Sequence, residues 1–110
     1  MKMPSCESAN VPIEKITDYL LSSSHPRGSL KARWFKALEY KTEKPNELAK
    51  SLLSLASADV LASEKTDYGT KYVIVCDITG PDGRTAAVHS IWILPNGSSE
   101  PKLVTAYSSK

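Results

Sequence analysis

The hydrophobic period of this 110-residue chain changes near residue 58, from the spacing of helices to the two-residue alternation of strands. Before the change, apolar residues recur three and four positions apart. After it, runs rich in β-branched residues alternate with turns rich in glycine and proline. This order indicates an α+β fold, with helices packed on one face of an antiparallel sheet.

Three helices are predicted before the change, over residues 12–24, 29–39 and 45–57. Pro12 suits the first turn of the first helix, and Ser29 is a reasonable N-cap for the second. Apolar residues at helical spacing give each segment a stripe that can face a core.

Four strands are predicted after the change, over residues 59–67, 71–78, 86–94 and 102–107. The first is polar and weakly strand-like, whereas the other three are rich in residues that favour strands. The sequences GPDGR and PNGSSEP predict tight turns between them. The predicted fold is therefore three N-terminal helices followed by a four-stranded antiparallel β-meander sheet. At this length we expect one domain, residues 12–110, after a flexible tail over residues 1–11.

Composition and charge limit which classes of protein this chain can belong to. A hydrophobic content of 41% and a charged content of 24% are typical of a soluble globular protein. The net charge of +2 permits contact with phosphates but is smaller than the excess usual in a dedicated nucleic-acid binder. Cys6 and Cys76 suggest neither a disulfide framework nor a zinc site. No apolar leader and no run of membrane-spanning length are found, so we expect a cytoplasmic protein with no membrane partner.

The second predicted helix contains a lysine at an unusual position. On a helical wheel of about 100° per residue, Lys31 falls within the apolar arc that includes Leu30, Trp34 and Leu38. Such a lysine either extends to water along its aliphatic stem, which is the more frequent case, or lies beside a cleft with a partner. His25 lies just before the same helix, and a helix N-terminus favours anions. These features together suggest a phosphate site.

The strands carry further candidates. By alternation His89 shares a face with Ile91 and Ile93, but both faces of this strand are apolar, so its side of the sheet stays open, and a lone histidine in a strand is more often structural. In the last strand, alternation places Leu103, Thr105 and Tyr107 on one face. No nucleotide-binding loop and no metal-binding or serine-hydrolase motif is found, so any hydrolysis here would use neither a metal nor a cofactor.

Five short motifs in order resemble a small bacterial domain family of unknown function, whose members stand alone or form the C-terminal tips of polymorphic toxins. They are H-P-x-G-x-x-K-A-x-W-F (25–35), G-x-K-Y (69–72), G-P-x-G-R (80–84), I-W (91–92) and L-V-T-A-Y (103–107). That family is similar to the metal-independent ribonuclease superfamily that groups barnase, EndoU, the tRNA-cleaving colicins and RelE-like toxins.

The resemblance implies cleavage of RNA by attack of the 2′-OH on the adjacent phosphate, and it assigns roles residue by residue. His25 would be the base or the acid, and Lys31 would stabilise charge on the phosphate. Thr105 and Tyr107 match hydroxyl residues that face the active site in related toxins, although Ser108 here follows Tyr107 where proline is common there. Three further residues are candidate substrate-binding residues: Arg33, Ser90 and Trp92.

The partners implied by the resemblance are RNA and a cognate inhibitor protein. Two other functions stay open from the sequence. One is a non-catalytic module of the same fold that binds RNA or a protein. The other is a regulatory protein that uses the sheet as an interface. Exposed apolar residues on both faces of the third strand, together with a dimer in solution, would favour it.

Overall fold

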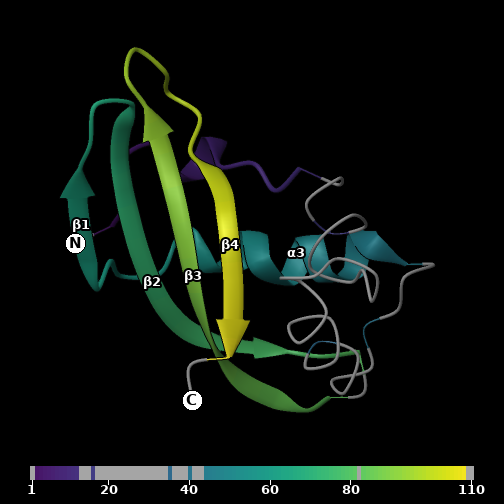
Figure 1. The fold of residues 1–110 in the computed structure, drawn as a ribbon. Coiled ribbons are helices and arrows are strands. Elements are labelled where there is room, and N and C mark those ends of the chain that lie inside the picture. The colour runs from purple at the N-terminus through teal and green to yellow at the C-terminus, as the bar shows by residue number, and fades with distance from the viewer. Residues whose placement is uncertain are drawn as a thin grey trace, which may run out of the picture.

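A computed structural model describes residues 2–12, 16, 35, 40, 44–81 and 83–108 of the chain. Within them lie a short 3-10 helix, one α-helix and four strands. They are η1 (Cys6–Ser8), α3 (Pro45–Leu55), β1 (Ala62–Lys65), β2 (Gly69–Thr79), β3 (Thr85–Pro95) and β4 (Lys102–Ser108). The strands form one curved sheet, and α3 crosses behind it (Figure 1). No helix in the described ranges is long and apolar enough to cross a membrane.

The sheet is an antiparallel meander in the order β1-β2-β3-β4. β2 and β3 pair along their whole length, from Gly69 opposite Pro95 to Thr79 opposite Thr85. The turn that joins them contains the predicted GPDGR sequence, and the bond from Gly80 N–H to the Arg84 carbonyl closes it at 2.7 Å. Alternating, β-branched sequences therefore form the long central strands.

The predicted architecture of three N-terminal helices followed by the sheet is wrong: the described residues contain one α-helix, α3, ahead of the strands. The other two predicted helices, over residues 12–24 and 29–39, lie outside the described residues apart from Pro12, Ile16 and Phe35. Ile16 and Phe35 are buried, as their apolar character requires.

Helix α3 supplies one side of the core. Pro45 begins it, where a missing N–H costs nothing. Leu48, Leu52 and Leu55 recur at helical spacing and are at most 1% exposed, so each contributes about 1.5–3 kcal/mol through burial. The helix ends at Leu55, two residues before the predicted end.

The N-terminal segment, for which we predicted a flexible tail, contacts the domain from Lys2 onward. Met3 is 2% exposed and belongs to the core, as does Val11. Asn10, near the end of this segment, forms two backbone hydrogen bonds with the start of β4. The Asn10 N–H donates to the Pro101 carbonyl at 2.8 Å, and the Asn10 carbonyl accepts from the Leu103 N–H at 3.1 Å. Residues 2–11 thus pack as part of the same unit.

The face of the sheet that contacts the core carries a buried polar pair. Ser90 and Trp92 on β3 are both 0% exposed. The indole N–H of Trp92 donates to Ser90 Oγ at 3.0 Å, and Ser90 Oγ donates to the Ile74 carbonyl at 2.9 Å. A buried donor without a partner is costly, so Ser90 allows tryptophan to lie in the core.

We predict that Ser90→Ala lowers the free energy of unfolding by about 2 kcal/mol, because it leaves the indole N–H of Trp92 buried without an acceptor. In a Trp92→Phe background, which has no such donor, the same change should cost about 1 kcal/mol less. Urea unfolding of the wild type, the two single variants and the double variant measures the difference between the two costs. Equal costs of Ser90→Ala in both backgrounds would show that the two side chains are not coupled.

A β-bulge lies in β4 where the β3–β4 register shifts between Ile91 and Trp92. Leu103 is 2% exposed and Ala106 is 0% exposed, so both face the core although strict alternation would put them on opposite faces. The extra residue of the bulge resolves this conflict. The prediction that Leu103 shares a face with Thr105 and Tyr107 is therefore wrong, because the bulge turns Leu103 to the core side.

Candidate functional site

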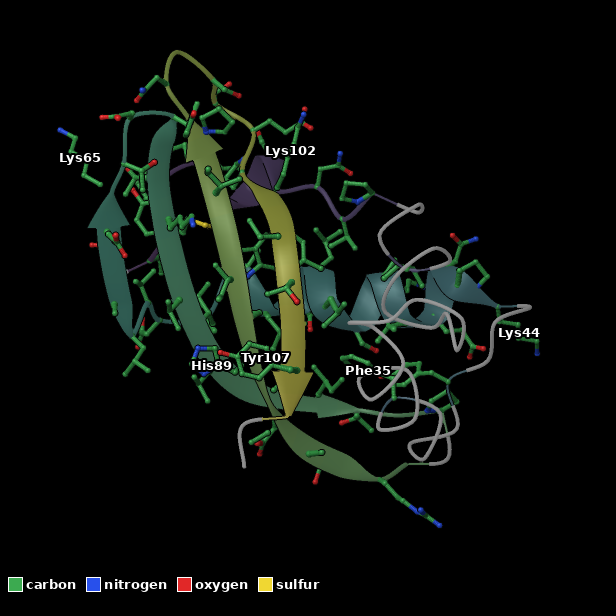
Figure 2. The ribbon with its side chains drawn as sticks, viewed as in Figure 1. Phe35, Lys44, Lys65, His89, Lys102 and Tyr107 are labelled. Atoms are coloured by element: carbon green, nitrogen blue, oxygen red, sulfur yellow. The ribbon has the colours of Figure 1, made fainter. Side chains whose placement is uncertain are left out.

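His89 and Tyr107 form a stacked pair on the face of the sheet that is turned away from the core. They are direct partners in the β3–β4 register. Their ring centroids are 4.7 Å apart, and the ring planes differ by 13°. Figure 2 shows the two side chains beside each other where β3 and β4 run together. Both are partly exposed.

The alternation of β3 and the bulge of β4 bring this pair together. Val88, Ser90 and Trp92 face the core, so His89 must face the other way. Beyond the bulge, Thr105 pairs with Ile91 and lies in the neighbouring row of the same face. We call the side chains of His89, Ile91, Thr105 and Tyr107, with Val73 and Val75 of β2, the outer face. All six are partly exposed.

The outer face combines groups that can move a proton and bind an anion. An imidazole gains and loses protons near neutral pH. Tyrosine and threonine hydroxyls donate hydrogen bonds to oxyanions. Because Tyr107 covers a face of the His89 ring, the stack fixes the ring plane and leaves the ring edge, which carries both nitrogens, for a substrate. The arrangement suits acid–base chemistry on a phosphate ester.

The structure brings together part of the predicted site. Thr105 and Tyr107 lie on the outer face, as neighbours of His89. Ser90 and Trp92 lie on the core side at 0% exposure and bond to each other, so we leave them out of the site below. The remaining predicted site residues lie outside the described residues: His25, Lys31 and Arg33.

His89 is the residue that sequence reasoning did not place. Both faces of its strand are apolar, so hydrophobicity does not reveal which face a helix covers. A signal was present in composition, since His89 is one of two histidines in the chain. The pairing of the last two strands would have placed it opposite Tyr107.

A groove lies between α3 and β2, with a volume of about 520 Å³. We call it the α3–β2 groove. Glu47, Lys50, Ser51 and Ser54 line it from α3, and Asp77, Thr79, Gly80 and Pro81 line it from β2 and the turn that follows, with Tyr40 between the two sides. Its lining residues therefore include charges of both signs.

Tyr40 closes the inner wall of the α3–β2 groove. Its hydroxyl hydrogen-bonds with Ser51 Oγ at 2.7 Å and with the Thr79 carbonyl oxygen at 3.0 Å. Burial raises the pKa of the Tyr40 phenol above its usual value; the bond with Ser51 lowers this pKa, and the nearby Glu47 carboxylate raises it. The phenol therefore stays neutral and joins α3 to the end of β2.

Nothing in the described part of the chain gathers three or more histidine, cysteine or acidic side chains into a group that could hold a metal ion. Cys6 and Cys76 are both free thiols. Cys76 is exposed.

Comparison with known proteins gives a family and a fold. A family model described as a domain of unknown function (DUF6883) matches residues 2–110. A solved chain from a contact-dependent growth inhibition toxin–immunity protein complex of Klebsiella pneumoniae 342 has a similar fold. The TM-score is 0.74 at 18% identity, over 96% of this chain and 97% of that chain. At this identity the likeness shows the fold alone. No curated protein matches the chain.

Proposed function

The chain belongs to the DUF6883 family of domains of unknown function. From the stacked His89–Tyr107 pair on the outer face, we propose that it is a toxin-related domain that cleaves RNA without a metal ion. The pair carries the proposal because it sets a proton-transfer group beside hydroxyls on a partly exposed sheet face. The fold supports the toxin-related part, since the similar solved chain comes from a growth inhibition toxin–immunity complex.

The proposed reaction needs two proton-transfer groups. A base takes the proton of a ribose 2′-OH, and the freed oxygen forms a bond to the adjacent phosphorus. The bond from phosphorus to the 5′-oxygen breaks, an acid protonates that oxygen, and a 2′,3′-cyclic phosphate remains. We assign one of the two roles to His89 and the other to His25.

Charge develops on the phosphate oxygens in the transition state, so donors must be in place around them. We assign this role to the Tyr107 hydroxyl and to Thr105 on the outer face, and to the predicted cation Lys31. Arg33 would contact the RNA backbone, because a guanidinium binds phosphate well.

A cell that makes such an enzyme must protect its own RNA. We therefore include a cognate inhibitor protein among the proposed partners, in line with the complex from which the similar solved chain comes. The inhibitor would cover the outer face, since that face holds the proposed site.

Incubation of the purified chain with total RNA in the presence of a chelator tests the proposal. We expect cleavage by the wild type, and strongly reduced cleavage by Lys31→Ala and His25→Ala. Lys65→Ala, on the exposed strand β1, is the matched control and should cleave normally. Absence of cleavage by the wild type, or cleavage that needs added metal, would contradict the proposal.

A further inference from the structure

Strand β1 covers only the first part of the edge of β2. The four residues of β1 pair with Thr70–Val73, whereas β2 continues to Thr79. Figure 1 shows β2 extending and bending well beyond the end of β1, with α3 behind it. The second half of β2 therefore forms part of the sheet's edge.

Hydrogen bonds show which backbone groups point outward along this edge. The carbonyls of Gly69 and Val73 accept from Thr66 N–H and Leu61 N–H, on the β1 side, both at 2.7 Å. In an antiparallel strand the backbone groups of alternate residues point to the same side. The Thr79 carbonyl is at an alternate position to Gly69 and Val73, and it accepts a bond from the Tyr40 hydroxyl.

Val75 and Asp77 lie between these positions, so their N–H and C=O groups also point to this edge, which no described strand covers. Neither residue has a backbone partner on that side among the described residues. An edge of this kind can accept one more strand, because an added chain satisfies a row of donors and acceptors at once.

The α3–β2 groove lies beside this edge. Asp77 and Thr79 belong to both, and Glu47 and Lys50 line the helix side of the groove. Asp77 alternates with Val75 and pairs with Ala87, so its carboxylate lies on the outer-face side of this edge, where it favours a positively charged neighbour. Side chains alternate along a strand, so a strand added here would direct every second side chain toward α3 and the others to the side of Asp77.

We propose that the edge of β2 at Val75–Asp77 binds an extended peptide segment of a partner protein, which adds as a strand beyond the first residue of β1 and places a basic side chain beside Asp77. The site uses the backbone edge of β2, next to the Val75 side chain on the outer face, and includes none of the groups proposed for the RNA chemistry. Backbone pairing would supply affinity, and the Asp77 carboxylate would select the basic residue.

A synthetic peptide of alternating valine and lysine, blocked at both ends, tests this site on the full chain by NMR. We expect binding with a Kd below about 1 mM. The amide signals of Val75 and Asp77 should shift, and their hydrogen exchange should slow. A version methylated on alternate backbone nitrogens cannot pair as a strand and should not bind. A version with glutamate in place of lysine should bind more weakly.

Substitutions distinguish peptide binding at this edge of β2 from peptide binding at other strand edges. Asp77→Asn should weaken binding by about fivefold, as loss of one partly exposed charge pair implies. Glu64→Gln on β1 should leave binding unchanged. The proposal is overturned if the peptide does not bind at about 1 mM, if methylation has no effect, or if the shifts fall on Ser63 and Lys65 of β1. Equal affinity of the glutamate peptide would overturn the proposed preference for a basic residue.

Discussion

Replacing His89 by alanine is expected to lower the rate of RNA cleavage by about 100- to 10,000-fold, the usual contribution of a general acid or base. His89 is partly exposed and contacts Tyr107 by stacking, so its loss should change stability little compared with its effect on rate. Initial rates on a defined RNA, measured without metal, give the factor directly. Thermal unfolding of the same samples shows whether the fold is retained.

Variants of Tyr107 distinguish the stack from the hydroxyl. Tyr107→Phe keeps the ring against His89 and removes the proposed donor to the phosphate, so it should cost about 10- to 100-fold in rate with little loss of stability. Ser99→Ala, on the exposed turn between β3 and β4, is the matched control. A His89→Ala protein that folds and cleaves at the wild-type rate would remove His89 from the site.

Gly69→Ala is expected to lower the free energy of unfolding by about 3 kcal/mol, at the upper end of ordinary single substitutions. A Cβ at Gly69 would lie 2.3 Å from the Leu94 carbonyl oxygen and 2.7 Å from the Pro95 Cα. Both are backbone atoms of the paired strand β3, so no side-chain rotation can relieve the overlap. The start of β2 would have to separate from the end of β3.

Gly97→Ala is the matched control for this effect. Gly97 has φ 77°, which is unfavourable for alanine, but an added Cβ there meets no described atom within 4 Å. It should cost about 1 kcal/mol, from backbone strain alone. Urea unfolding of both variants measures the difference. If both variants lost the same free energy of unfolding, the close approach of β3 to Gly69 would not be the reason that a side chain is excluded at this position.

The sequence pattern predicts β2, β3 and β4 well. Their β-branched runs give predicted strands whose ends lie within two residues of the observed ends. Strand β1 is different. Its sequence ASEK is polar and every residue is exposed, so nothing in its own side chains favours a strand. Its conformation follows from pairing with Thr70–Val73, which a local pattern does not contain.

The candidate site was predictable only in part for a similar reason. Tyr107 and Thr105 are recognisable from the final motif, but the bulge that separates them from Leu103 depends on how β4 meets β3. Which face of β3 is covered depends on where α3 packs. His89 therefore becomes a site residue only once the packing is known, while Ser90 and Trp92 become core residues.

The chemistry of the new RNA ends tests the central claim most directly. We predict that the wild type, in the presence of a chelator, leaves 2′,3′-cyclic phosphate ends on the RNA, and that an oligonucleotide with a 2′-deoxyribose at the cut position stays intact there. His89→Ala should yield few such ends. Ends with a free 3′-hydroxyl, or cleavage of the deoxy-substituted position, would contradict attack by the 2′-OH and with it the proposed function.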